Sequence, residues 1–415
     1  MMVGALDGIR VLDITRVLAG PWCTQYLADL GAEVIKIERP QSGDDTRAWG
    51  PPYMISDSGE QTLESSYYMS ANRGKLSVAL DFSSEEGQKI LQDLVKDVDV
   101  LVENYKVGGL KKYGLDYESL IKINPRLVYC SITGYGQTGP RAKEPGYDFV
   151  VQGLGGLMSI TGENDNFPSA GPQKVGVAVA DLMSGTNAAL SICAALYSRE
   201  MTGEGQHIDI ALLDTQVAML ANQSMNYLTS LNIPGRYGNA HANIVPYNVF
   251  KASDREFVIA CGNDRQFVAL SKVIGLPDLP LDPRFATNAG RVINREEITE
   301  ILAKQLLTKT AKEWIDLIAA VNVPVGPINN IKEAIEEPQI IAREMVVSME
   351  HPLKKKNYYV IGSPLKFSKT PVRYKSAPPL LGQHTKEVLV RFLGMGDEEM
   401  KALTSAGVIS LKEGL

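Results

Sequence analysis

The first third of the chain alternates between apolar segments of strand length and helical patterns, and this alternation limits the possible folds more than any other feature. Residues 11–14 have the pattern of a buried strand, residues 25–30 that of a helix ending at Gly31, and residues 33–38 that of the next strand. Later segments repeat the alternation: 76–80, 84–95, 100–103, 126–132 and 206–211. Strands separated by helices form mostly parallel sheets with both faces covered. The sequence therefore predicts an α/β fold with a Rossmann-like parallel sheet.

At 415 residues, the chain is longer than most domains with a single hydrophobic core, so more than one domain is expected. We assign residues 1–225 to the first part of a large α/β domain. From about residue 226 the pattern changes to a polar loop, short strands and helices, which predicts a smaller α+β domain over 226–328. Residues 329–415 are expected to return to the large domain.

Charge and cysteine usage narrow the class of protein. A net charge of −6 argues against nucleic acid as a partner, because phosphate binding rests on a basic surface. The four cysteines show no C-x-x-C spacing, which favours a reducing compartment and gives no sign of a zinc site: Cys23, Cys130, Cys193 and Cys261. With neither a signal-peptide pattern nor an apolar span of roughly 18 residues in view, we expect a cytoplasmic protein without a membrane partner.

Asp181 is the strongest candidate for a chemical role. It ends an apolar run, and the residues after it recur at helical spacing up to about Arg199, so it is placed at or just before a helix N-terminus. Free backbone N–H groups and the helix dipole stabilise a carboxylate there, so we expect Asp181 to be ionised at neutral pH and able to attack an activated acyl carbon. An ordinary N-cap is the alternative.

The loop after the first strand, residues 16–21, is the natural ligand site of such a sheet. Glu38 lies about 20 residues further on, as in dinucleotide-binding proteins. However, the loop lacks the pattern G-x-G-x-x-G, and Pro21 removes a backbone donor, so a nicotinamide cofactor is not expected. His207 and His241 lack the paired spacing of metal ligands, and His207 is interpreted as strand packing.

Taken together, nine segments resemble the class III CoA-transferases, the CaiB/BaiF family that includes formyl-CoA transferase and carnitine CoA-transferase. The resemblance covers nearly the whole chain and rests on these residues: 8–13 (GIRVLD), 18–21 (LAGP), 31–40 (GAEVIKIERP), 43–47 (GDDTR), 72–75 (NRGK), 102–104 (VEN), 134–140 (GYGQTGP), 175–185 around Asp181, and 379–385 (PLLGQHT). It implies an enzyme whose substrates are a CoA thioester and a small carboxylic acid, with no permanently bound cofactor and no metal. It also implies an interlocked homodimer.

The resemblance assigns the role of covalent catalyst to Asp181, through aspartyl anhydride and aspartyl-CoA thioester intermediates. It assigns CoA contacts to eight residues: Val17, Leu18, Ala19, Arg39, Leu80, Asn104, Tyr105 and Lys112. Four more residues are candidates for lining the active site: Tyr147, His241, Gly262 and Asn263. Formyl-CoA transferase has Gln in place of Leu18, which argues against formate or oxalate as the substrate.

Within the family, residues 238–247 and 262–267 are most similar to members that transfer CoA from succinyl-CoA to dicarboxylates such as glutarate. The alternative in the same family is an acyl-CoA racemase or epimerase, which uses a histidine base where this chain has Tyr147. Because a phenol, with a pKa of about 10, is a poor base at neutral pH, the transferase is favoured. A CoA-binding protein without catalysis is a second alternative, and the intact Asp181 argues against it.

Overall fold

The computed structural model describes residues 4–168 and 170–412 and divides into two compact units. The large unit contains Met1–Gly155, Gly176–Met219 and Pro338–Leu415, and the small unit contains Gly156–Val175 and Leu220–Glu337. The sequence predicted domain boundaries after residues 225 and 328. In the structure, the chain passes into the small unit after residue 219 and returns to the large unit after residue 337. The short excursion of Gly156–Val175 into the small unit was not predicted.

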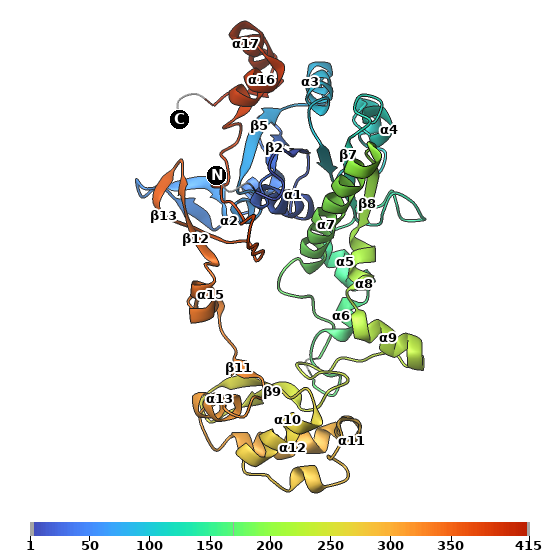
Figure 1. Ribbon diagram of the computed structural model, residues 1–415, viewed down its shortest axis with the longest axis vertical. Coiled ribbons are helices and arrows are strands. Elements are labelled where there is room, and N and C mark those ends of the chain that lie inside the picture. Colours follow the sequence, from blue (N-terminus) through green and yellow to red (C-terminus); the bar gives the residue numbers. More distant parts are fainter. Residues whose placement is uncertain (1–3, 169, 413–415) are drawn as a thin grey trace. The chain divides into compact units, whose positions relative to one another are not determined.

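A seven-stranded sheet forms the centre of the large unit (Figure 1). Its strands are β1 (Arg10–Asp13), β2 (Glu33–Glu38), β5 (Lys75–Leu80), β6 (Val100–Glu103), β7 (Val128–Thr133), β8 (His207–Ala211) and β14 (Ile409–Ser410). They lie in the order β14-β5-β2-β1-β6-β7-β8, and all neighbours are parallel except β14, which is antiparallel to β5. The six parallel strands have the doubly wound order, so the predicted Rossmann-like sheet is confirmed.

Apolar side chains leave both faces of the sheet, as parallel strands between two helical layers require. On one face, Val11 and Val34 pack with residues of α1 (Ala19–Asp29) and α7 (Val179–Thr202). On the other face, Leu12 and Ile35 belong to a core that includes residues of α3 (Glu85–Val95), α4 (Tyr117–Leu120), α16 (Thr385–Leu393) and α17 (Asp397–Ser405). Neighbouring residues of one strand therefore serve opposite cores.

Helix α7 is long and apolar enough to cross a membrane by length and composition, with a mean hydropathy of 1.3 over its best 18 residues. In the large unit it instead packs on α1, and its side chains Ala188 and Ile192 are fully buried in the core. Gly185 permits the close approach, because a Cβ at that position would lie 2.4 Å from the carbonyl oxygen of Ala19. The N-terminus of α7 is thereby held beside the loop that leads into α1.

The remaining elements of the large unit are short. They are η1 (Asp45–Ala48), β3 (Tyr53–Ile55), β4 (Gln61–Ser65), α2 (Ser66–Ser70), η2 (Lys111–Tyr113), α5 (Asp148–Leu154), α8 (Leu212–Ala218), α15 (Pro338–Ala342), β12 (Val346–His351) and β13 (Lys354–Ile361). Strands β3 and β4 form one antiparallel pair, and β12 and β13 form another.

The small unit has a core of its own around Phe257, Phe267 and Trp314. An antiparallel sheet with the order β11-β10-β9 is formed by β9 (Tyr247–Lys251), β10 (Glu256–Ala260) and β11 (Val325–Pro327). Its helices are α6 (Leu157–Ile160), α9 (Ala221–Ser230), α10 (Asp264–Val273), η3 (Leu279–Leu281), α11 (Asn288–Ile293), α12 (Arg295–Leu306), α13 (Ala311–Ala319) and α14 (Ile331–Ile335). The unit is therefore of the α+β type that the sequence predicted.

Candidate active site

A cavity of about 150 Å³ lies in the large unit, where the carboxyl ends of its strands meet the first turn of α7. Its lining follows β1, β6 and β7 and includes Asp181: Arg16, Val17, Leu18, Ala19, Asn104, Tyr105, Lys106, Val107, Ile132, Thr133, Gly134, Ala142, Glu144, Pro145, Gly146, Tyr147, Asp181 and Leu212. Strands β1 and β6 are neighbours that lead to opposite sides of the sheet. The cavity therefore lies at the switch point where doubly wound folds bind ligands.

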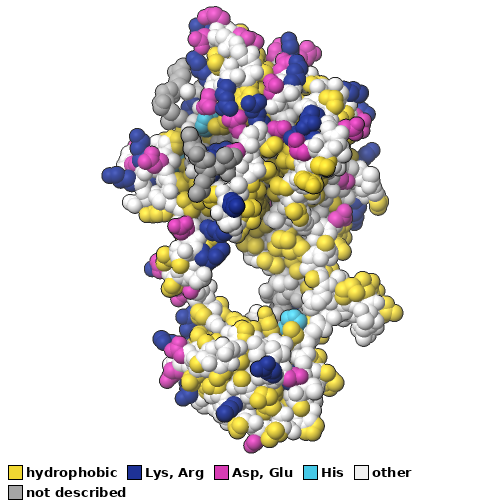
Figure 2. Space-filling model, in the orientation of Figure 1, with side chains coloured by type: hydrophobic (Ala, Val, Ile, Leu, Met, Phe, Trp, Pro, Cys, Tyr) yellow, Lys and Arg dark blue, Asp and Glu magenta, His cyan; other side chains and the backbone are white. Residues whose placement is uncertain are grey.

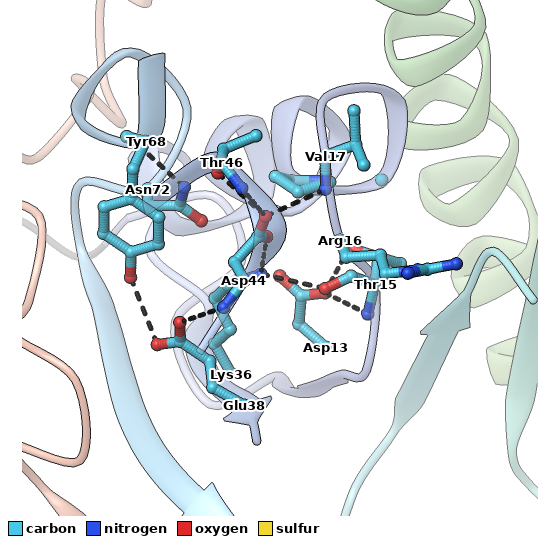
Figure 3. A network of polar contacts seen from close by, with 12 residues as sticks. Asp13, Thr15, Arg16, Val17, Lys36, Glu38, Asp44, Thr46, Tyr68 and Asn72 are labelled. Carbon is cyan, nitrogen blue, oxygen red and sulfur yellow. Dashed lines mark hydrogen bonds and ion pairs between the residues drawn. The ribbon is translucent and has the colours of Figure 1, made fainter. Parts of the chain in front are cut away.

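A fully buried network of charges supports the loop after β1 (Figure 3). The Asp13 carboxylate accepts hydrogen bonds from the Thr15 N–H, at 2.9 Å, and from Lys75 Nζ, at 3.1 Å. Lys36 Nζ donates to the Thr15 carbonyl oxygen at 2.9 Å and to Asp44 Oδ2 at 3.0 Å. Burial alone would raise the pKa of Asp13, but the charges of Lys75 and Lys36 lower it to about 2. Asp13 is therefore ionised and holds the loop in place.

The loop itself has a strained conformation that its neighbours maintain. Val17 has φ of +72°, a left-handed value that β-branched residues rarely adopt, and its N–H donates to Asp44 Oδ1 at 3.2 Å. Asn104 pairs with the backbone of Arg16 twice, accepting from its N–H at 3.0 Å and donating to its carbonyl oxygen at 2.7 Å. The wall formed by residues 16–19 is thus fixed without a ligand.

Asp181 is the third residue of α7, so the predicted position at the start of a helix is confirmed. It is not an N-cap, because Ala178 holds that position and offers no side-chain hydrogen bond. The amide of Ala180 instead donates to Oδ1 of Asp148, the first residue of α5, at 2.8 Å. A carboxylate from a different helix therefore caps α7.

The prediction that Asp181 is ionised because of free helix amides is wrong. Burial raises the pKa of Asp181 to about 7, and the negative charge of Asp148 adds to the effect. The N–H of Ala180 bonds to Asp148, and in the described part of the chain no group donates a hydrogen bond to the Asp181 carboxylate. Asp181 is therefore a mixture of protonated and ionised forms at neutral pH.

Most of the predicted site residues of the large unit come together. The cavity lining contains Asp181 and the following predicted residues: Val17, Leu18, Ala19, Asn104, Tyr105 and Tyr147. Three others do not line it. Arg39 is exposed and pairs with Asp45 at 3.1 Å, Lys112 is exposed on η2, and the side chain of Leu80 is buried in the core. Their predicted CoA contacts stay predictions.

The other three predicted residues belong to the small unit. The Nδ1 atom of His241 accepts a hydrogen bond from the N–H of Asn243 at 3.0 Å. Asn263 is the N-cap of α10, and the N–H of Gly262 donates to Gln266 Oε1 at 2.8 Å. These local contacts account for their conformations, and their predicted place at the active site stays a prediction.

The two histidines considered above each have a hydrogen-bond partner. His207 lies at the start of β8, where Nε2 is 2.9 Å from Ser131 Oγ and the ring stacks on Tyr117 with 5.0 Å between centroids. Over residues 4–168 and 170–412, no group of three or more His, Cys, Asp or Glu side chains is arranged to hold a metal ion.

Four charged residues of the site were not among the predicted set: Arg16, Lys106, Glu144 and Asp148. Arg16 and Lys106 directly adjoin predicted contacts, so the positions after β1 and β6 could have identified them. Asp148 is a first-turn acid of its own helix. Its contact with a helix that starts 31 residues later has no local sequence signal.

Comparison with known proteins decides the family. The model of CoA-transferase family III matches residues 6–385. The chain belongs to this family. As a family III CoA-transferase it uses a CoA thioester as a substrate, and the resemblance stated from sequence motifs is confirmed.

Among curated relatives, this CoA-transferase is 48% identical to succinate–glutarate CoA-transferase of Agrobacterium fabrum, over 92% of this chain and 94% of that protein. It is 44% identical to human succinyl-CoA:glutarate CoA-transferase, over 98% of this chain and 90% of that protein. Among solved structures, a CAIB/BAIF family protein from Brucella suis superposes with a TM-score of 0.82 at 45% identity, covering 94% of this chain and all of that one.

Proposed function

We propose that this CoA-transferase moves CoA from succinyl-CoA to a dicarboxylic acid such as glutarate, with Asp181 as the covalent catalyst. The observation that carries the proposal is the position of Asp181 in the cavity at the β1–β6 switch point. It is a partly desolvated carboxylate that accepts no hydrogen bond from the described part of the chain, so its oxygens are free to attack.

The reaction proceeds in four steps. The ionised Asp181 attacks the thioester carbonyl of succinyl-CoA, the C–S bond breaks, and a mixed anhydride and CoA thiolate result. The thiolate attacks the aspartyl carbonyl, which releases succinate and leaves an aspartyl-CoA thioester. The acceptor carboxylate then attacks this thioester and expels the thiolate again. Finally the thiolate attacks the acceptor's acyl carbon, which gives the new acyl-CoA and restores the Asp181 carboxylate.

The substrate assignment is supported by the relatives of high identity whose names specify succinyl-CoA and glutarate. For the donor we propose that CoA contacts residues at or beyond the carboxyl ends of β1, β2, β5 and β6: Val17, Leu18, Ala19, Arg39, Leu80, Asn104, Tyr105 and Lys112. For the acceptor side we propose Tyr147, which lines the cavity together with Asp181. Racemase activity stays the alternative within the family.

The test is the intact-protein mass after incubation with succinyl-CoA, with hydroxylamine or borohydride to trap the adduct. We expect a succinyl or CoA adduct on the native enzyme that is absent from Asp181→Ala. Asp214→Ala is the matched control, because Asp214 is also a first-turn aspartate, on α8, but is exposed and outside the cavity lining. A screen of dicarboxylates of increasing length then identifies the acceptor.

Two outcomes would contradict the proposal. An adduct that persists in Asp181→Ala would assign the covalent role to another residue. Exchange of an α-proton of a branched acyl-CoA with solvent deuterium, without adduct formation, would favour the racemase.

We further propose that the enzyme is a homodimer, interlocked as the family resemblance implies. The support is apolar surface on the large unit, where hydrophobic side chains gather near α7 and α8 (Figure 2). Its most exposed members on α7 are Leu190, Tyr197 and Met201, each more than two thirds exposed. Light scattering coupled to size-exclusion chromatography measures the oligomeric state directly, and a mass near 45.2 kDa at micromolar concentration would contradict the dimer.

We also propose a cytoplasmic location, which the four free thiols support.

A further inference from the structure

The carboxylate of Asp148 lies against the first turn of α7 and is held there from two sides. Its Oδ1 accepts the N–H of Ala180 at 2.8 Å, and its Oδ2 accepts Nε2 of Gln152 at 2.7 Å. Asp148 is 8% exposed and Gln152 is fully buried. Both oxygens are therefore occupied, and the side chain is fixed in a largely dry environment.

The contact between Asp148 and Ala180 removes a hydrogen-bond donor that the first turn of α7 would otherwise present near Asp181. A carboxylate in the first helical turn is normally stabilised by the free amides around it. Here α7 has no side-chain cap of its own, and the amide of Ala180, directly before Asp181, is bonded to Asp148. Asp148 therefore takes the donor and replaces it with a second negative charge, which is the one charged group that raises the pKa of Asp181.

The other titratable groups near Asp181 come from several elements. Tyr67 of α2 faces it, since burial and then the Asp181 charge raise the pKa of that phenol. Along the cavity wall lie Arg16, Lys106, Glu144 and Tyr147. Arg16 is engaged by Asp45 at 2.7 Å. None of these groups is a cause of the raised pKa of Asp181, which leaves burial and Asp148.

We propose that Asp148 is a positioning residue of the transfer reaction: it fixes the first turn of α7 through the Ala180 amide and places a negative charge, in place of that donor, near Asp181, which keeps the Asp181 carboxylate strongly nucleophilic. The inference rests on the proposed function of Asp181. A carboxylate stabilised by helix amides is a weaker base and a weaker nucleophile. The cost of the arrangement is that Asp181 must lose its proton before it attacks, so the rate falls on acidification.

The test is the rate of adduct formation from succinyl-CoA between pH 5 and 8, in the native enzyme and in Asp148→Asn. Asparagine keeps an acceptor oxygen for Ala180 but carries no charge. We expect the acidic limb of the profile to move down by about one pH unit or more, and the plateau rate to fall several-fold. Asp214→Asn is the matched control, the same change at an exposed first-turn position, and should leave the profile unchanged.

The outcomes separate the inference from the proposed function. Adduct formation in Asp148→Asn with the native acidic limb would overturn the inference and leave the role of Asp181 intact. Absence of any adduct in the native enzyme would overturn the proposed function itself. If Asp148→Asn does not fold, as judged by thermal melting, Asp148→Ser offers a neutral hydroxyl acceptor, and the same downward shift is expected of it.

Discussion

Asp13 and Asp181 are both removed from most of the solvent in the same unit, and their pKa values are shifted in opposite directions. Asp13 is fully buried, yet its pKa is lowered to about 2, because Lys75 and Lys36 outweigh the effect of burial. Asp181 is less buried, yet its pKa is raised to about 7, because the effect of burial is not offset there by a cation, as it is at Asp13, and the charge of Asp148 adds to it. Burial depth therefore does not predict ionisation here, whereas the sign of the neighbouring charge does.

The two regions also divide the work of the site. The Asp13 network fixes the backbone of Thr15, from which the cavity wall at Arg16 to Ala19 continues. In the Asp181 region, no residue that the structure describes donates a hydrogen bond to the carboxylate at the end of that wall. The buried ion pairs around Asp13 thus support a wall that ends at two neighbouring carboxylates, Asp181 and Asp148.

The largest effect is expected from removing one of the lysines that pair with the buried Asp13 carboxylate. Lys75→Met removes a buried partner at 3.1 Å and should lower the free energy of unfolding by about 3–5 kcal/mol, as loss of one member of a buried ion pair does. Urea denaturation measures it. Lys89→Met, an exposed lysine on α3, is the control and should change stability by less than about 0.5 kcal/mol. Equal, small effects of both substitutions would show that the Asp13 charge is not structurally required.

Lengthening the side chain at position 181 should have the next largest effect. Asp181→Glu keeps the charge but moves the carboxylate by about one methylene, and a misplacement of this size costs about 100-fold in rate. Steady-state CoA transfer measures kcat, while binding of succinyl-CoA should change little. Activity within a few-fold of the native enzyme would mean that the position of the carboxylate is not fixed by α7.

The raised pKa of Asp181 predicts that this proposed nucleophile destabilises the fold. Because its folded-state pKa of about 7 lies above the unfolded value, ionisation costs stability as pH rises from about 4 to 7. Asp181→Asn should therefore stabilise the protein by about 2 kcal/mol above pH 7 and by almost nothing near pH 4. Thermal melting at both pH values measures the difference. A stabilisation independent of pH would argue against a raised pKa.

The smallest effect is expected where the two regions join. Asn104→Ala removes the two hydrogen bonds that tie Arg16 to the end of β6. The loop stays anchored by the Asp13 network, so we expect folding to persist and the KM for succinyl-CoA to rise by about 10-fold, the equivalent of one or two hydrogen bonds. Initial-rate kinetics provide the value. An unchanged KM would remove Asn104 from the proposed CoA contacts.

The parts of the fold that were predicted correctly depend on local patterns. Periodicity identified β1, α1 and β2, and the parallel character of the sheet followed from the separation of its strands by helices. The position of Asp181 in a helical first turn was readable from the residues after it. The contacts that were missed join distant segments: Lys75 with Asp13, 62 residues apart, and Ala180 with Asp148, 32 residues apart. The hydrophobic periodicity of a segment does not indicate which distant segment its polar groups will contact.

By itself the sequence determined the parallel sheet, the family and the placement of one aspartate at the start of a long helix, because hydrophobic periodicity and motif order are properties of continuous segments. Only the tertiary structure decided whether that aspartate is charged. The pKa of a buried group depends on which charges the fold brings near it and which donors they occupy. At Asp181, burial raises the pKa, the nearby charge is a second carboxylate, and the Ala180 amide already donates to that carboxylate, so the anion is destabilised where the sequence predicted that it would be stabilised.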